Sequence, residues 1–325
     1  MRRFAYVQAD SAEGARELVR DDPQARFYAG GTTLVDLMKG GVEVPSRIVD
    51  ISRLPLAGIA VRPDGVRIGA LARNSDVAYD QTIATRLPAL SQALLSGASG
   101  QIRNAATVGG NLLQRTRCSY FRETRWRCNK REPGSGCDAL DGYNRAHAVL
   151  GTSESCIATY PGDMAVALVA LSAKVVVEGD GGERRVPIED FYVLPGAQPE
   201  RETTLAHGEL VTAVEVPFAA VHERSHYRKV RDRASYEFAL VSVACGVVLQ
   251  NGRIHDVRLA LGGIATIPWR AHEAEALLLG ATASDETFVQ AARTALAGAR
   301  PRRDNAFKVE LAQRTVVRAL REAAA

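Results

Sequence analysis

Four of the five cysteines gather in one 39-residue stretch, at Cys118, Cys128, Cys137 and Cys156. The stretch shows neither helical periodicity nor strand alternation, and a loop of that length in a compact domain is usually functional or disordered. Four thiolates supplied by one segment suit a tetrahedral metal ion or an iron–sulfur cluster, and binding would order the segment. We therefore predict a redox or metal site here.

The spacing of these cysteines, C-x9-C-x8-C-x18-C, is not that of a ferredoxin, so the ligands would come from a folded loop. Taken alone, the residues favour structural Cys₄ zinc, which is common and flexible in spacing. A disulfide pair is a further alternative in an oxidising compartment. The fifth cysteine, Cys245, lies in the apolar run ALVSVACGVVL and is predicted to be a buried, inert thiol outside the site.

Basic and aromatic residues are interleaved with the clustered cysteines. Positive charge near a cysteine favours thiolate over thiol, so these residues could balance the charge of a thiolate site. The same pattern is equally typical of a solvated face or a subunit rim. The net charge of +4, from 41 basic and 37 acidic residues, is too small and too evenly spread to indicate a nucleic-acid partner. The residues concerned are Arg115, Arg117, Arg122, Arg125, Arg127, Lys130 and Arg131, with Tyr120, Phe121 and Trp126.

Two glycine-rich turns could approach a phosphate. The first, Gly30-Gly31-Thr32-Thr33, follows the short strand predicted at 27–29 and leads into the helical segment LVDLMK. Free backbone N–H groups at such a turn, with threonine hydroxyls, suit an anion, although either turn could be merely a tight turn. The second, TVGGN at 107–111, repeats the pattern without a clear helix after it. No G-x-G-x-x-G and no P-loop is present, which argues against a Rossmann or P-loop nucleotide site.

The six histidines, at 147, 207, 222, 226, 255 and 272, are scattered. Their surroundings are mostly polar, so each is predicted to be a surface residue and not a catalytic base. We predict no catalytic residue in this chain.

Strands and helices are expected on both sides of the cysteine stretch, which indicates an α+β class. Predicted helices span 11–20, 80–95, 162–173, 268–279, 285–299 and 305–322; predicted strands span 47–51, 58–62, 65–70, 174–179, 210–217, 226–230, 239–249 and 253–261. The composition changes near Ala220 and Glu223, so we predict domains at 1–222, with an insertion at 112–160, and at 223–325. No run approaches a membrane span, and the first residues lack a signal-peptide core, so we expect neither.

Together these pieces resemble the FAD-binding subunits of the xanthine oxidase, or molybdenum hydroxylase, family. Their motif A-G-G-T-x-L is matched by Ala29–Leu34, and T-[IV]-G-G-N by Thr107–Asn111. Their helix-opening aspartate is matched by Asp163, and a lysine in YRKVRDRASY by Lys229. The order and spacing agree over essentially the whole chain.

The resemblance implies a two-lobed FAD-binding fold followed by a smaller C-terminal α+β domain. The two glycine turns would hold the FAD pyrophosphate, Asp163 the sugar-like chain or ring, and Lys229 the isoalloxazine, where positive charge stabilises reduced flavin. The implied cofactor-contacting residues are Arg26, Phe27, Tyr28, Ala29, Gly30, Gly31, Thr32, Thr33, Leu34, Thr107, Gly109, Gly110, Asn111, Asp163, Val211 and Lys229.

One departure from the family pattern is informative. Asp163 follows Asn111 by 52 residues, much further than in most of the family, and the insertion carries all four clustered cysteines. The branch with this insertion, the flavin subunits of bacterial periplasmic aldehyde oxidoreductases, binds a [4Fe–4S] cluster in it, and the strings GNLLQRTRC and CNKREPGSGC are similar to that branch. The resemblance therefore implies FAD and a [4Fe–4S] cluster on Cys118, Cys128, Cys137 and Cys156.

The function so implied is electron transfer within a molybdenum-dependent aldehyde oxidoreductase. A large molybdenum-cofactor subunit would oxidise the aldehyde, a small [2Fe–2S] subunit would relay electrons to FAD, and an external acceptor would receive them. The chain would be cytoplasmic, or periplasmic through co-export with a signal-bearing partner. Alternatives are the flavin subunit of a hydroxybenzoyl-CoA reductase-like or xanthine dehydrogenase-like enzyme, a stand-alone flavin oxidase, or a non-enzymatic zinc-stapled module.

Overall fold

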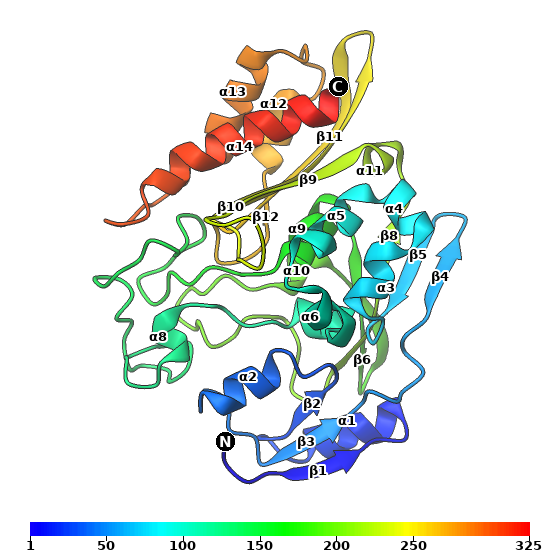
Figure 1. The fold of residues 1–325 in the computed structure, drawn as a ribbon, viewed down its shortest axis with the longest axis vertical. Helices are drawn as coiled ribbons and strands as arrows, with labels where there is room; N and C mark the ends of the chain where they lie inside the picture. The colour runs from blue at the N-terminus through cyan, green and yellow to red at the C-terminus, as the bar shows by residue number, and fades with distance from the viewer.

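The computed structural model describes all residues from Met1 to Ala325, and its strands form three sheets. The first is a small parallel sheet of order β1-β3-β2, in which β3 pairs with both neighbours. Its strands and their connecting helices are β1 (Ala5–Gln8), α1 (Ala12–Arg20), β2 (Arg26–Tyr28), α2 (Leu34–Lys39) and β3 (Arg47–Asp50). This parallel lobe lies at the bottom of Figure 1, in blue.

The second sheet is antiparallel and has five strands in the order β4-β5-β8-β6-β7. Its order brings β8, far along the chain, between β5 and β6, so that residues before and after the cysteine segment share one sheet. Its strands are β4 (Ile59–Arg62), β5 (Gly65–Gly69), β6 (Lys174–Gly179), β7 (Gly182–Pro187) and β8 (Leu210–Pro217).

Short helices pack around this central sheet. The predicted single helix over 80–95 is wrong: the structure has two, because Pro88 begins the second and Leu87 between them is not helical. The helices are α3 (Asn74–Tyr79), α4 (Gln81–Arg86), α5 (Pro88–Ser96), α6 (Gly100–Ala105), α7 (Val108–Leu112), α9 (Asp163–Ala170) and α10 (Ile188–Phe191).

The third sheet is antiparallel, of order β12-β11-β10-β9, and is covered by the last helices of the chain (Figure 1). Asn251 and Gly252, both with positive φ, form the tight turn between its two long strands. Its elements are α11 (Ala220–Glu223), β9 (Ser225–Val230), β10 (Val241–Gln250), β11 (Arg253–Gly262), β12 (Trp269–Arg270), α12 (His272–Leu278), α13 (Asp285–Ala295) and α14 (Phe307–Ala324).

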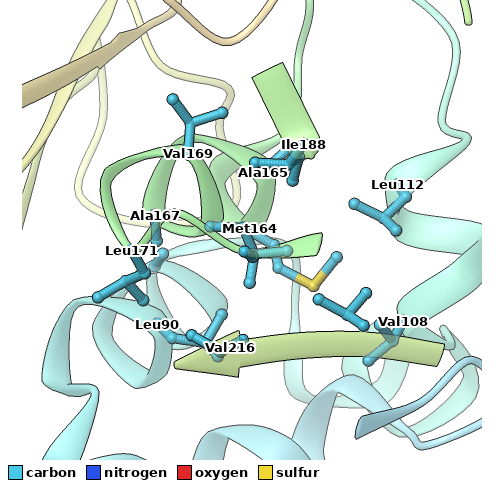
Figure 2. Close-up of a cluster of buried hydrophobic side chains, with 14 of the residues drawn as sticks. Leu90, Val108, Leu112, Met164, Ala165, Ala167, Val169, Leu171, Ile188 and Val216 are labelled. Atoms are coloured by element: carbon cyan, nitrogen blue, oxygen red, sulfur yellow. The ribbon is translucent and has the colours of Figure 1, made fainter. Parts of the chain in front are cut away.

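Helix α9 joins the central and C-terminal sheets. All eight of its residues are buried, and it contacts α5 on one side and β10 and β11 on another. Figure 2 shows its apolar side chains, such as Met164, surrounded by Leu90, Leu112 and Val216 from separate elements. Because every residue of α9 after Asp163 is apolar and buried, packing on every side fixes the position of the helix.

The cysteine segment contains little regular structure, as predicted. Between Cys118 and Cys156 there is one short helix, α8 (Ser119–Arg122), at the left of Figure 1. The strand prediction was otherwise close, but β1, β7 and β12 were missed, and β12 lies where the helix over 268–279 was expected to begin. The two-lobed α+β class is confirmed. No helix is long and apolar enough to cross a membrane.

Candidate flavin site and cysteine site

The first glycine turn is built against α6. A Cβ added to Gly30 would lie 2.0 Å from the carbonyl oxygen of Ala105, which excludes any side chain there. Gly31 has a φ of +70°, a conformation that non-glycine residues rarely adopt. The two glycines therefore hold the backbone between β2 and α2 in close contact with the end of α6.

The second turn is fixed against the end of β5. The N–H of Gly109 donates to the carbonyl of Ala70 at 2.8 Å, and the Oγ1 of Thr107 accepts from the N–H of Gly110 at 3.3 Å. Thr107 thereby caps a short helix, α7, which the sequence did not clearly indicate.

Two cavities meet where the glycine turns lie side by side. One, of about 400 Å³, lies over the parallel lobe, and the other, of about 270 Å³, extends toward α9 and β9. Thr32, Thr33 and Gly110 line both. All sixteen residues predicted to contact a cofactor line one or the other, with Val211 in the larger and Asn111, Asp163 and Lys229 in the smaller.

A buried ion pair lines the smaller cavity. The Nζ of Lys229 lies 2.8 Å from Oδ2 of Asp163, and their side chains are only 4% and 9% exposed. Lys229 also donates to the carbonyl of Ser96 at 3.2 Å. The lysine charge is thus balanced by a carboxylate within the protein, so any flavin there would meet a pair and not a lone cation.

Tyr227 is a site residue that the sequence interpretation missed. Its hydroxyl donates to Oδ1 of Asp163 at 2.6 Å, so both carboxylate oxygens of Asp163 have partners. Burial, followed by the negative charge of Asp163, raises the pKa of Tyr227. The alternation of β9 could have revealed it, because residues two apart on a strand share a face and Lys229 was already a candidate.

The structure brings the four clustered cysteines into one region. Cys128 and Cys137 pair across an isolated antiparallel bridge, while Cys118 and Cys137 pack on the same small apolar cluster. Burial raises the pKa of Cys118 to about 12 and of Cys156 to about 11, and the proximity of other cysteines adds to both shifts. All five cysteines are free thiols, and no three His, Cys, Asp or Glu side chains come close enough together to hold one metal ion.

The basic residues of this segment are mostly neutralised by carboxylates. Lys130 and Arg115 both contact Glu202, at 3.0 and 2.6 Å, and although burial opposes it, their charges lower the pKa of Glu202. Arg117 and Arg122 pair with Asp36 in the same way. Arg125 and Arg127 also pair with carboxylates, those of Glu123 and Asp138, but they are largely exposed, as the interpretation of a solvated face expects.

Lys130 influences the pKa of one clustered thiol. Its charge opposes the effect of burial on the pKa of Cys156, and both residues line a third cavity, of about 420 Å³. That cavity shares Arg26, Leu113 and Arg115 with the larger cavity over the glycine turns. The cysteine segment therefore adjoins the candidate flavin site.

The prediction that every histidine lies at the surface is wrong for two of them. His147 and His222 are buried, because tertiary packing encloses polar segments that give no apolar signal in the sequence. His147 lies 3.1 Å from the sulfur of Cys118 through Nε2. Cys245, in contrast, is fully buried as predicted.

Comparison with known proteins accounts for the whole chain. The family described as the FAD binding domain in molybdopterin dehydrogenase matches residues 2–219, and the CO dehydrogenase flavoprotein C-terminal domain matches residues 225–323. The chain is 48% identical to the aldehyde oxidoreductase FAD-binding subunit PaoB of Escherichia coli (strain K12), over 100% of this chain and 99% of that one. It is 30% identical to the glyceraldehyde dehydrogenase medium chain of Sulfolobus acidocaldarius, over 87% and 83% of the two chains.

Solved structures agree with this result. Carbon monoxide dehydrogenase from Hydrogenophaga pseudoflava superposes with a TM-score of 0.78 at 28% identity, covering 99% of this chain and 97% of that one. Quinoline 2-oxidoreductase from Pseudomonas putida 86 gives 0.77 at 26%, with the same coverage. This chain belongs to the family of FAD-binding subunits of the molybdenum hydroxylases, and is thus a subunit of an oxidoreductase.

Proposed function

We propose that this chain is the electron-transferring subunit of a heteromeric, molybdenum-dependent aldehyde oxidoreductase, with FAD between its glycine turns and a [4Fe–4S] cluster on its cysteine segment. The observation that carries the proposal is the meeting of both turns at the junction of two cavities, in a chain 48% identical over its full length to an aldehyde oxidoreductase subunit.

FAD fits the residues present at the two turns. The contact of Gly30 with Ala105 leaves bare backbone at the cavity wall, where an anion can approach N–H groups closely. Thr32 and Thr33 add hydroxyl donors from the same turn. The chemistry that FAD supplies when bound is the acceptance of electrons from partner subunits and their delivery to an external acceptor.

The cysteine segment also fits an iron–sulfur cluster in its donor set. Four thiols, two of them buried, are the ligands that such a cluster requires, and no disulfide uses them. In this proposal Cys118, Cys128, Cys137 and Cys156 hold the cluster, and Lys130 favours the thiolate form of Cys156. Turnover of an assembled, cluster-free complex tests whether electrons pass through the cluster. Undiminished turnover would exclude an obligatory relay and leave a structural or docking role.

The proposed partners are a large subunit with the molybdenum cofactor and a small [2Fe–2S] subunit. Location in the cytoplasm, or in the periplasm after co-export with a signal-bearing partner, is part of the proposal. An aldehyde is favoured over a purine because the putative xanthine dehydrogenase FAD-binding subunit of E. coli is only 27% identical.

The test is the cofactor content of the full chain co-expressed with its genomic neighbours. We expect stoichiometric FAD, and about four irons and four acid-labile sulfides beyond those of the [2Fe–2S] clusters. The change Cys128→Ser should remove these irons and spare FAD, whereas Cys245→Ser, a buried cysteine outside the segment, should leave both unchanged. Zinc in place of iron would refute the cluster and leave the flavoprotein.

Substrate class is tested on the same preparation. Oxidation of aromatic and aliphatic aldehydes should exceed that of hypoxanthine or a hydroxybenzoyl thioester. Turnover of the purine alone would place the complex with the xanthine dehydrogenases instead.

A further inference from the structure

His147 is held inside the cysteine segment, and nothing in its local sequence indicates a function for it. It lies between Cys137 and Cys156, is only 5% exposed, and points Nε2 at the sulfur of Cys118, 3.1 Å away. Its other ring nitrogen, Nδ1, is buried and has no hydrogen-bond partner. The contact with Cys118 is therefore the one polar contact that the imidazole makes.

The backbone around His147 is fixed by the C-terminal helices. Its carbonyl oxygen accepts from Nζ of Lys308 at 3.0 Å and from Nδ2 of Asn305 at 3.4 Å, and both of these residues are fully buried. Its N–H donates to the carbonyl of Asn144 at 3.0 Å. These contacts fix the backbone of His147, and the burial of its ring limits the movement of the side chain away from the sulfur.

The chemistry of the pair sets the direction of the hydrogen bond. A sulfur that is bound to a metal as thiolate has no proton and can only accept. The Nε2 atom must then carry the proton, which leaves Nδ1 as a bare acceptor. Hydrogen bonds from residues outside the ligand set orient the ligands of a metal site and tune its potential.

We infer that His147 is a positioning residue for the cysteine site: its Nε2–H donates to the sulfur of Cys118 and raises the reduction potential of the cluster. The inference rests on the cluster of the proposed function. Reduction adds negative charge to a cluster, and a hydrogen-bond donor on a ligand sulfur stabilises the more negative state. Loss of the donor should therefore make the potential more negative.

Cys118 lies on the side of the cysteine site that adjoins the flavin cavity, where a change in the potential of the cluster would matter for electron transfer. Cys118 and His147 both line a cavity of about 300 Å³. That cavity shares Arg117, Pro161 and Phe238 with the smaller flavin cavity. The sulfur that accepts from His147 is thus the one bordering the space that leads toward Asp163 and Lys229.

The experiment uses the full-length chain, purified anaerobically, in four forms: unmodified, His147→Leu, His147→Gln and His222→Leu. Leucine removes the donor and keeps an apolar side chain in the packed position, whereas the glutamine amide can place an N–H near the position of Nε2. His222 is similarly buried but donates from Nδ1 to the carbonyl of Pro217, away from the cysteines, and is the matched control. Iron content, the midpoint potential of the cluster and pulsed EPR with ¹⁵N-histidine are measured on each.

The expected result is full iron content in all four forms and a more negative potential in His147→Leu only. Glutamine should restore most of the shift, and the unmodified protein should show a weak ¹⁵N coupling that the leucine variant loses. An unchanged potential in an iron-loaded His147→Leu protein would overturn the inference. Loss of iron from His147→Leu and His147→Gln, together with a strong ¹⁵N coupling in the unmodified chain, would also overturn the inference. His147 would then be a ligand of the cluster.

Failure of the proposed function gives a different result. If the unmodified chain contains no iron, the cluster itself is refuted and the role of His147 falls with it. The two failures are distinguished by the iron content of the unmodified chain alone.

Discussion

At the scale of single residues, Gly30 in the first glycine turn has no room for a side chain. Its Cα faces the carbonyl of Ala105, and an added Cβ would come within 2.0 Å of that oxygen. The neighbouring atoms belong to backbone, which cannot rotate away as a flexible side chain could. A side chain at this position must therefore move the turn or α6.

For Gly30→Ala we expect the FAD content to fall about tenfold or more, because a shift of the turn that costs 1.4 kcal/mol in binding is already tenfold. Gly100→Ala is the control, since a Cβ there meets nothing within 4 Å and α6 begins at that residue. The measurement is flavin absorbance per chain after purification. Equal flavin in the two variants would mean that the turn does not touch the cofactor.

The pair of Lys229 and Asp163 predicts an order of stabilities. Lys229→Met leaves a buried carboxylate without its cation and should cost about 3–5 kcal/mol, whereas Tyr227→Phe removes one hydrogen bond to that carboxylate and should cost about 1.5–3 kcal/mol. Urea unfolding measures both. Lys174→Met, at an exposed lysine of β6, should change little. A Tyr227 variant as unstable as the Lys229 variant would contradict this order.

At the scale of elements, helix α14 holds the cysteine segment in place. The fully buried Lys308 donates from Nζ to the carbonyls of Ala146, His147 and Gly263, at 3.3, 3.0 and 2.6 Å. Three acceptors match the three N–H groups of an ammonium. The last helix of the chain is thus anchored to the segment that lies far from it in sequence.

This anchor predicts a pH dependence. Burial, followed by the positive charge of Arg145, lowers the pKa of Lys308 from 10.5 to about 7. Between these values the unfolded chain binds more protons than the folded one, so the free energy of unfolding should rise with pH from about 7 and gain nothing below it. Unfolding in urea at pH 6 to 9 should show this rise, and Lys308→Met should lack it. Parallel curves for the two proteins would refute the shifted lysine.

At the scale of the molecule, the candidate flavin site is formed by elements that lie far apart in the sequence. The smaller cavity takes Thr32 from the parallel lobe, Gly110 from α7, Asp163 from α9 and Lys229 from β9. A ligand that fills it therefore contacts several elements at once and binds only when they are assembled.

Removal of FAD should accordingly lower the melting temperature of the whole chain and not of one part. Saturation at a hundred times the dissociation constant contributes about 2.7 kcal/mol. Calorimetry of the same preparation before and after flavin removal measures the shift, and re-addition should restore it. The Gly30→Ala protein serves as the control, because tenfold weaker binding at the same FAD concentration would contribute only about 1.4 kcal/mol and give a smaller shift.

The sequence by itself determined the parts that depend on local chemistry. The glycine turns, the capped helix α1, the strand β6 and the scarcity of regular structure in the cysteine segment were predicted because short-range backbone preferences and side-chain patterns determine them. The resemblance of motifs spread along the chain gave the family. A local pattern also misled the prediction before Pro88, where helical spacing over 80–95 indicated one helix and the structure has two.

Only the tertiary structure decided which distant residues meet. Tyr227 contacts Asp163, and His147 contacts Cys118, across separations that no periodicity encodes. Lys308 is fully buried although its residue type favours the surface, because three backbone carbonyls from other segments satisfy it. Such contacts follow from the packing of whole sheets and of α9 between them, and packing depends on every part of the chain at once.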